Sequence, residues 1–392
     1  DVYEKERLKH GQRAAVERGG EGGAAGVGDL GVVEVEPLEL RQPSSRRRRR
    51  TCRRRRRHEG GEALVADWND PDVMADFVKG CDVVTVESEW GPAEVAENLD
   101  NDIPVWPSSQ TLQAIRHKGR QKKVLEEAGI PLPRHAICAS FDEASTAFRL
   151  FDNKVVAKRF EGSYDGYGNA TVTSEAELEQ AWKALAAEDG LLIESFVPFV
   201  RELAVLVARS PSGESVVYPV VNTEQKDHRC HAVTVPAGIS AETDAKAQEL
   251  ALAAADAVKS VGILGVEFFE LPDGSLLLNE LAPRPHNTGH YTIEACHTSQ
   301  FENHVRAILD WPLGDPSLRV PAAVMINVLG HREGPVCTQG LQEALSIAGA
   351  SVHIYGKKEA KPKRKMGHVT VTAENTTDAR LKAEQAALAI QL

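Results

Sequence analysis

The stretch Asn279-Glu280-Leu281-Ala282-Pro283-Arg284-Pro285-His286-Asn287-Thr288-Gly289-His290 closes a predicted strand and opens a loop crowded with polar side chains. The apolar run Leu276–Leu278 predicts that the strand is buried, and a Pro-Asp-Gly turn joins it to a second strand over Gly265–Glu270. Arg284 can hold a small oxyanion through its planar fork, and His286 can transfer a proton near neutral pH. Pro and Gly fix side-chain directions in such loops, so we predict a functional site here.

Two carboxylates and an amide lie on these two strands. Glu267 is on the first strand, and Asn279 and Glu280 end the second. Two carboxylates and an amide that leave room for phosphate oxygens form a typical Mg²⁺ site at a nucleotide. The alternative is one acid on each solvent face. The apolar flank argues against it, because a carboxylate that ends a buried strand is costly unless it is paired or metal-bound.

A second candidate site follows the predicted strand Val155–Lys158. Lys158 precedes the loop Glu161–Asn169, which contains three glycines. Glycine lets backbone N–H groups approach phosphate oxygens, and the lysine supplies charge. The loop matches neither the Walker pattern nor the dinucleotide fingerprint, and a plain hairpin loop remains the alternative.

A basic stretch lies near the C-terminal end of the chain, in Tyr355–His368. Its cations are Lys357, Lys358, Lys361, Lys363, Arg364 and Lys365. Their density in an otherwise acidic region favours a monophosphate site, with Lys357 and Arg364 or Lys365 as ligands. A solvated basic face is the alternative.

The remaining pattern from Ala63 onward is that of an α/β protein. Short apolar runs predict strands. Ser108 or Ser109 can cap the helix that follows the strand at Val105. We expect strands at 83–86, from 105, 155–158 and 191–197, antiparallel strands within 202–239, and helices at 92–99, 110–128, 174–187 and 242–260.

The first 62 residues have a different composition. They hold a glycine cluster and two arginine blocks, Arg46–Arg50 and Arg53–Arg57, whose like charges repel. We expect a disordered segment, or the product of a misread exon. A patch that binds nucleic acid or a membrane, or that targets the chain, is the alternative.

Charge and hydropathy exclude several classes of protein. The 392 residues include 46 Lys and Arg against 57 Asp and Glu, and eleven of the arginines lie within 41–58, so about −22 remains on the rest of the chain. Such an acidic body does not suit a nucleic-acid binder. No apolar run approaches the roughly 18–20 residues of a membrane span. The six cysteines are scattered without zinc spacing, which indicates a reducing compartment.

Taken together, these motifs resemble those of the ATP-grasp enzymes. The order of Lys158–Asn169, Glu194–Val197, Glu267, Asn279–His290 and Tyr355–His368 is similar to that of carboxyaminoimidazole ribonucleotide synthases. The stretch 279–303 most resembles the fungal and plant version, called phosphoribosylaminoimidazole carboxylase, in which a mutase-type carboxylase domain is fused to the synthase. The resemblance covers about residues 64–392.

The resemblance implies an α/β (α+β) ATP-grasp fold. Its parts would be an atypical segment (1–62), a remnant of a Rossmann-like pre-ATP-grasp domain (63–115), an ATP-grasp lid (116–200), an ATP-grasp catalytic domain (201–325) and a small β-rich C-terminal subdomain (326–392). The family opens with a glycine-rich loop at the substrate phosphate, and residues 1–62 do not match it. We therefore expect the N-terminal domain to be incomplete.

The resemblance also implies a reaction. ATP phosphorylates bicarbonate to carboxyphosphate, which carboxylates aminoimidazole ribonucleotide in purine biosynthesis, with ATP and Mg²⁺ as cofactors. Expected partners are these small molecules, a second copy of the chain in a homodimer, and a fused or separate mutase-type carboxylase domain, but no membrane and no nucleic acid. The expected compartment is the cytoplasm, with the plastid as the alternative. The alternative function is a weakened ATP-grasp chain that binds nucleotide or serves as a fusion or oligomerisation module.

Site residues follow from the resemblance position by position. Mg²⁺ would be held by Glu267 and Glu280, and bicarbonate by Arg284 and His286. The substrate would meet Glu87 through its ribose and Lys357, Arg364 and Lys365 through its phosphate, with Lys357 also counted as catalytic. ATP would contact Lys118, Lys158, Ser163, Tyr164, Asp165, Gly166, Gly168, Glu194, Phe196, Val197, Glu202 and Asn279.

Overall fold

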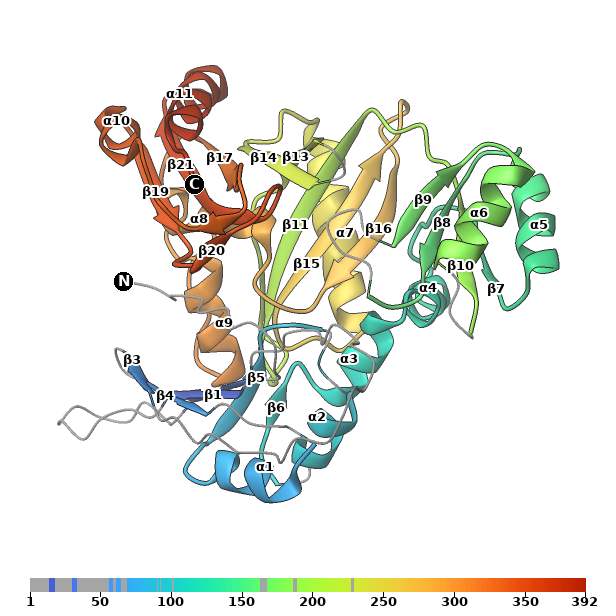
Figure 1. Ribbon diagram of the computed structural model, residues 1–392, viewed down its shortest axis with the longest axis horizontal. Coiled ribbons are helices and arrows are strands. Elements are labelled where there is room, and N and C mark those ends of the chain that lie inside the picture. Colours follow the sequence, from blue (N-terminus) through green and yellow to red (C-terminus); the bar gives the residue numbers. More distant parts are fainter. Residues whose placement is uncertain are drawn as a thin grey trace.

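The computed structural model describes residues 14–17, 30–33, 56–58, 61–64, 69–89, 91, 93–100, 102–162, 168–185, 189–226 and 229–392. These residues form sheets of six, four and nine strands and a two-stranded ribbon. In Figure 1 the six-stranded sheet lies at the bottom, the four-stranded sheet at the right and the nine-stranded sheet in the centre and upper left.

The six-stranded sheet forms the N-terminal part and has the order β3-β4-β1-β2-β5-β6. Its strands are β1 (Ala14–Glu17), β2 (Leu30–Val33), β3 (Arg56–His58), β4 (Gly61–Leu64), β5 (Val83–Val86) and β6 (Val105–Trp106). The central strands β2, β5 and β6 are parallel. Helices α1 (Pro71–Val78), α2 (Ala93–Asp100) and α3 (Ser109–Arg116) complete a core that includes Phe77, Val84 and Leu112.

Strands β1, β2 and β3 lie in the segment where we expected no regular structure. The short run Leu30–Val33 is apolar and β-branched, and it pairs residue by residue with Val83–Val86. Glycines and arginines surround this run, so its signal is weak in the sequence. The blocks Arg46–Arg50 and Arg53–Arg55 lie outside the described residues.

The single helix predicted over 110–128 is wrong, because the chain forms two helices there. Helix α3 ends at Arg116 and α4 (Lys118–Glu127) begins after His117, which has extended φ and ψ of −96° and 110°. The Nδ1 atom of His117 accepts a hydrogen bond of 3.2 Å from the Arg120 N–H and so caps α4. The predicted cap at Ser108 is confirmed: its hydroxyl accepts from the Thr111 N–H at 3.2 Å.

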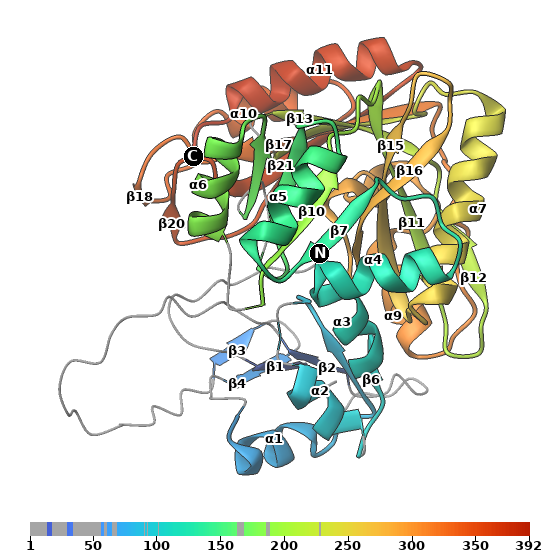
Figure 2. The same cartoon turned by 90° about the vertical axis from the view of Figure 1, so that its right-hand side faces the viewer.

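The four-stranded sheet is antiparallel and has the order β7-β10-β8-β9. Its strands are β7 (His135–Cys138), β8 (Val155–Arg159), β9 (Asn169–Val172) and β10 (Leu191–Ser195). Helices α5 (Phe141–Leu150) and α6 (Glu175–Leu185) cover one face of it, as Figure 2 shows, and bury Phe148, Leu178 and Ile193. We call this unit, residues 135–195, the lid.

The nine-stranded sheet runs β16-β15-β11-β13-β14-β17-β21-β19, with β12 paired to β11. Every neighbouring pair is antiparallel. Its strands are β11 (Arg201–Arg209), β12 (Ser215–Val217), β13 (Val221–Lys226), β14 (Arg229–Val235), β15 (Gly262–Glu270), β16 (Leu276–Ala282), β17 (Ala322–Leu329), β19 (Ala350–Ile354) and β21 (Lys365–Ala373).

Helices cover both faces of this sheet. Leu203, Val205 and Val207 of β11 pack with α7 (Ala241–Ala257), while Ala204, Leu206 and Ala208 point to the opposite face. That opposite face is covered by the turn η1 (Asn287–Gly289), α8 (Thr292–Ala295) and α9 (Gln300–Ile308). The loop after β16 is therefore pressed against the sheet.

The C-terminal part continues the same sheet. Helices α10 (Leu341–Ser346) and α11 (Thr376–Ala389) pack beside β17, β19 and β21, and the ribbon pairs β18 (Gly334–Pro335) with β20 (Glu359–Ala360). The predicted boundary at 325 falls inside β17, and the one at 62 falls inside β4. The domain boundaries themselves stay predictions. Among the described residues, no helix is both long and apolar enough to cross a bilayer.

Candidate active site

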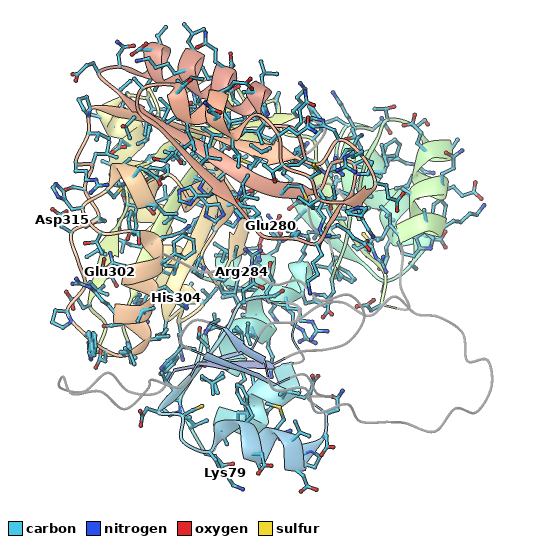
Figure 3. The ribbon with its side chains drawn as sticks, turned by 60° about the vertical axis from the view of Figure 1, so that its left-hand side comes forward. Lys79, Glu280, Arg284, Glu302, His304 and Asp315 are labelled. Atoms are coloured by element: carbon cyan, nitrogen blue, oxygen red, sulfur yellow. The ribbon has the colours of Figure 1, made fainter. Side chains whose placement is uncertain are left out.

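Two carboxylates lie side by side where β15 and β16 pair. Glu267 and Glu280 are direct cross-strand partners, and a register shift follows immediately after Glu267. Burial, together with the charges of Glu280 and Glu202, raises the pKa of Glu267 to about 7. The predicted acidic pair is therefore brought together. Figure 3 labels Glu280 near the centre of the molecule.

Glu280 has a lysine partner. The Nζ atom of Lys118, at the start of α4, donates to Glu280 Oε1 at 2.6 Å, and Lys118 is buried. Burial disfavours the ionised form of Glu280, but the ammonium beside it outweighs burial and lowers the pKa of Glu280. The break before α4 thus places Lys118, at the N-terminal end of that helix, against Glu280 of β16.

A buried ion cluster links the lid to β16. Lys158 forms an ion pair with Glu194 and donates to Asn279 Oδ1 at 3.1 Å. Lys122 also pairs with Glu194, at 2.8 Å, and donates to the Asn279 carbonyl at 3.0 Å. Burial opposes the charge on Glu194, yet the two lysines lower its pKa to about 2. Asn279, Lys158 and Glu194, all predicted ATP contacts, are therefore in direct contact.

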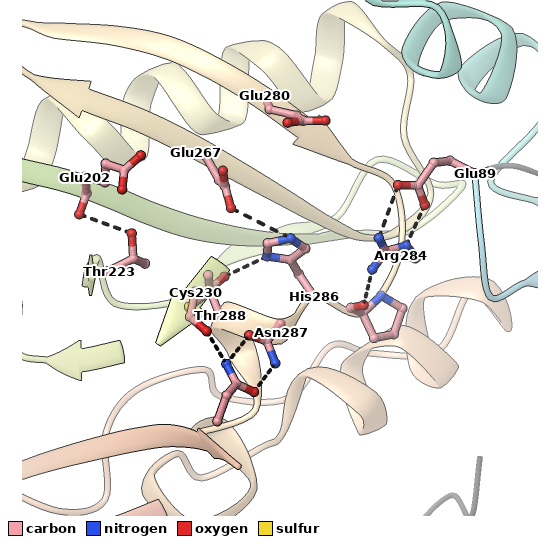
Figure 4. A network of polar contacts seen from close by, with 12 residues as sticks. Glu89, Glu202, Thr223, Cys230, Glu267, Glu280, Arg284, His286, Asn287 and Thr288 are labelled. Atoms are coloured by element: carbon pink, nitrogen blue, oxygen red, sulfur yellow. Dashed lines mark hydrogen bonds and ion pairs between the residues drawn. The ribbon is translucent and has the colours of Figure 1, made fainter. Parts of the chain in front are cut away.

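Arg284 has a carboxylate in its fork. Its Nε and Nη2 donate to the two Glu89 oxygens at 2.5 and 3.1 Å, and its Nη1 donates to the Pro285 carbonyl at 3.3 Å (Figure 4). Burial opposes the charge of Arg284, but Glu89, followed by Glu87 and Glu280, raises its pKa. The fork geometry predicted for a small oxyanion is present, and Glu89 of the N-terminal part occupies it.

His286 lies in the loop after β16, beside Glu267. Its Nδ1 is 2.9 Å from Thr288 Oγ1, and its Nε2 is 3.8 Å from Glu267 Oε1 (Figure 4). The next residue, Asn287, exchanges two hydrogen bonds of 2.9 and 2.7 Å with Asn327 of β17. The imidazole therefore presents its Nε2 atom to the carboxylate pair.

The predicted nucleotide contacts of the chain after β10 have other partners here. The N–H groups of Ser195 and Phe196 donate to the carbonyls of Arg134 and Lys154, at 2.8 and 3.0 Å. An adenine contact through these two groups would require them to exchange partners. Val197 is buried, while Phe196 is partly exposed and its ring lies 3.7 Å from Lys154 Nζ.

Glu202, the predicted ribose contact, lies on β11 opposite Thr223. Burial raises its pKa to about 6, against a hydrogen bond with Gln225 and the charge of Lys158. Its charge in turn raises the pKa of Glu267, so Glu202 lies at the same site.

The three predicted phosphate ligands differ in their surroundings. Lys365 begins β21, and its charge lowers the pKa of Glu267 against the effect of burial, so it lies within electrostatic reach of Glu267. Lys357 is buried: its ammonium donates to the Lys365 carbonyl and lies 5.4 Å from the Tyr355 ring centre. Arg364 Nη1 donates to the Glu359 carbonyl at 3.3 Å. Lys357 and Arg364 thus brace the loop that carries Lys365.

Part of the predicted site cannot be placed. Ser163, Tyr164, Asp165 and Gly166 lie outside the described residues. Gly168 is described: its φ is +81°, and its carbonyl accepts from the Arg159 N–H at 2.8 Å. The left-handed backbone suits glycine and turns the chain back into β9.

Two residues of the site, Lys122 and Glu89, were not predicted from the sequence. Lys122 follows Lys118 by one helical turn, so both lie on the buried face of α4. That spacing, with Leu125 on the same face, was a usable signal. Glu89 has no local signal in the sequence, because its partner Arg284 lies 195 residues further along the chain.

Three protein-family models match successive parts of the chain. They are the ribonucleotide synthetase preATP-grasp domain over 54–116, the ATP-grasp domain over 123–301 and the phosphoribosylaminoimidazole carboxylase C-terminal domain over 323–382. The predicted fold class is confirmed.

Curated relatives agree with these matches. The phosphoribosylaminoimidazole carboxylase of Schizosaccharomyces pombe is 40% identical over 321 residues, which cover 81% of this chain and 58% of the relative. The chain thus spans little more than half of that protein. The N5-carboxyaminoimidazole ribonucleotide synthase of Mycobacterium tuberculosis is 41% identical over 314 residues, which cover 79% of this chain and 73% of the relative.

A solved structure extends the comparison to the fold. The N5-carboxyaminoimidazole synthase of Aspergillus clavatus, in complex with ADP and 5-aminoimidazole ribonucleotide, matches with a TM-score of 0.75 and 35% identity, covering 83% of this chain and 85% of that one. Sequence, domain order and structure agree, so the chain belongs to the N5-carboxyaminoimidazole ribonucleotide synthase family of ATP-grasp proteins.

Proposed function

We propose that this chain carboxylates aminoimidazole ribonucleotide with bicarbonate at the expense of ATP, for purine biosynthesis. One observation carries the proposal: the buried Lys118 and Lys158 lie with the partly buried Glu267, Glu280 and His286 at one site, and Arg284 belongs to the same loop as His286. The family membership supports it, since the Aspergillus clavatus relative is described in complex with ADP and 5-aminoimidazole ribonucleotide.

The reaction brings three anionic reactants together, so the site must supply positive charge in a shielded place. The γ-phosphoryl group of ATP would pass to a bicarbonate oxygen, giving ADP and carboxyphosphate. The exocyclic amine of the ribonucleotide would then take up the carboxyl group, and phosphate would leave. Lys118 and Lys158 would hold the ATP phosphates, and Glu202 the ribose.

The remaining roles follow the same geometry. Arg284 and His286 would position bicarbonate once Glu89 gives up part of the Arg284 fork. Lys365 would meet the substrate phosphate, with Arg364 and Lys357 bracing its loop. Glu87 would contact the substrate ribose. Carboxyphosphate hydrolyses readily, so we expect the loop 163–169 to fold over the site.

The donor set fits Mg²⁺. Glu267 and Glu280 offer hard oxygen ligands from adjacent strands, and burial together with the charge of Glu280 raises the pKa of Glu267, which a bound cation would offset. Within the described ranges, no group of three acidic, His or Cys side chains forms a metal site, so phosphate oxygens and water would complete the coordination. A bound Mg²⁺ would neutralise phosphate charge during transfer.

The proposal extends to partners and compartment. A homodimer, a fused or separate mutase-type carboxylase domain, and a cytoplasmic or plastid location remain predictions. The alternative of a weakened nucleotide-binding chain rested on the unmatched N-terminus. The charge cluster in the described residues gives it no support.

Phosphate release tests the function directly. The purified chain is given Mg²⁺-ATP and bicarbonate, with and without aminoimidazole ribonucleotide. We expect strong stimulation by the ribonucleotide, and a loss of about 100-fold or more in Lys158→Met. Lys183→Met, which removes an exposed lysine of α6, is the control and should leave the rate unchanged. Release that ignores the ribonucleotide would overturn the proposal and favour the weakened chain.

A further inference from the structure

Gln300, the first residue of α9, is completely buried beside the His286 loop. Its Oε1 accepts from the His286 N–H at 2.8 Å, and its Nε2 lies 2.9 Å from the His286 carbonyl, to which it donates. The same Nε2 is 3.2 Å from His290 Nδ1. One side-chain amide therefore holds both backbone groups of His286 and the ring of a second histidine.

This clamp leaves the loop little freedom. A Cβ atom at Gly289 would stand 2.5 Å from Gln300 Oε1 and 2.3 Å from Leu206 Cδ1. A Cβ atom at Gly265 would stand 2.9 Å from the His286 Cβ. Close packing at these glycines, together with the contact between Thr288 and His286 Nδ1, restricts the position of the His286 imidazole.

We propose that Gln300 is a positioning residue for the carboxylation step, which aims His286 Nε2 at the bicarbonate site without touching substrate. This inference rests on the proposed function and deepens it. A displacement of about 1 Å in the position of a reacting group can lower the rate about 100-fold. The buried amide of Gln300 fixes the backbone of His286 at both its N–H and its carbonyl.

The same helix supplies a matched control. Asn303, three residues later in α9, is also completely buried. Its amide accepts from the Gly314 N–H at 2.7 Å and donates to the Gly314 carbonyl at 3.0 Å and to the Tyr218 hydroxyl at 2.9 Å. It makes the same kind of clamp on a loop remote from the acids. A merely structural role predicts equal effects at the two positions.

The experiment compares Gln300→Met with Asn303→Leu in ribonucleotide-stimulated phosphate release, at equal residual folding. We expect kcat to fall about 10–100-fold in Gln300→Met with the KM for ATP within about threefold, and both constants within about threefold in Asn303→Leu. Gln300→Glu, which can accept from His286 but not donate to it, should fall between wild type and Gln300→Met, and it serves if Gln300→Met does not fold.

A second readout does not depend on turnover. In ¹⁵N-histidine NMR, with the His286 ring signals assigned by a His286→Gln variant, we expect Gln300 variants to move the His286 signals and Asn303→Leu to leave them in place. Equal activity losses, or unmoved His286 signals in Gln300 variants, would overturn the inference. A wild-type chain without ribonucleotide-stimulated release would instead overturn the proposed function, and the NMR comparison would still decide on Gln300.

Discussion

Lys122→Met should destabilise the protein far more than the same change one residue later. Lys122 and Glu194 are both almost completely buried, and their ion pair of 2.8 Å links α4 to the lid. Methionine keeps the length of the side chain and removes its charge. Glu194 then keeps Lys158 as its only partner in this cluster.

The magnitude follows from the pKa of Glu194. Burial alone would raise it, but Lys122 and Lys158 bring it from 4.5 to about 2, a net depression worth about 3 kcal/mol. Removing one member of a buried pair typically costs about 3–5 kcal/mol. Lys122 has a larger effect on the Glu194 carboxylate than Lys158 has, so we expect a loss of about 2–3 kcal/mol at pH 7.

The sign of the pH dependence is fixed. Because the folded pKa of Glu194 is depressed, its ionised form stabilises the wild type fully above pH about 4.5, and this stabilisation is lost as the pH falls toward 2. In Lys122→Met the folded pKa of Glu194 lies closer to 4.5, so the loss of stability on acidification should be smaller and should end at a higher pH than in the wild type.

Urea denaturation at pH 7 and pH 3, followed by tryptophan fluorescence and circular dichroism, measures both effects. Lys123→Met is the control, since Lys123 is exposed and lies 4.0 Å from Glu127, a pair worth about 0.3–0.5 kcal/mol. Equal free energies of unfolding for the two variants would refute the assignment of Lys122 to the buried cluster.

Two further predictions concern His304 and Gly265. Burial lowers the pKa of His304 from 6.5 to about 4, so the free energy of unfolding of the wild type should fall by about 2 kcal/mol between pH 7.5 and pH 5. Urea midpoints should show a much smaller fall in His304→Gln, and parallel pH profiles for the two proteins would contradict the prediction. Gly265→Ala would place a Cβ atom 2.9 Å from His286, so ribonucleotide-stimulated phosphate release should fall at least about 10-fold while circular dichroism is unchanged, and full activity would show that the loop can shift.

The local signals of the sequence predicted most of the elements and the acidic pair. Alternating and apolar runs placed β5 and the strands of the central sheet, and the adjacency of β15 and β16 brought Glu267 to Glu280. The break at His117 escaped because the residues on both sides favour helix, and only a side-chain cap and a contact with Phe160 divide them. Glu89 escaped because its partner Arg284 is fixed by the packing of two domains.

The twist of the central sheet has a consequence for the site. Five strand-to-strand steps separate β15, which carries Glu267, from β21, which begins at Lys365. At roughly 20° of rotation per step, the two strands differ in direction by about 100°, enough for one end of the sheet to curl over the other. The charge of Lys365 acts on Glu267 across this span, although the two residues are nearly 100 positions apart in the chain. The number of strands is thus itself a geometric parameter of the site, and a chain with one strand more or fewer between β11 and β21 would aim its lysine elsewhere.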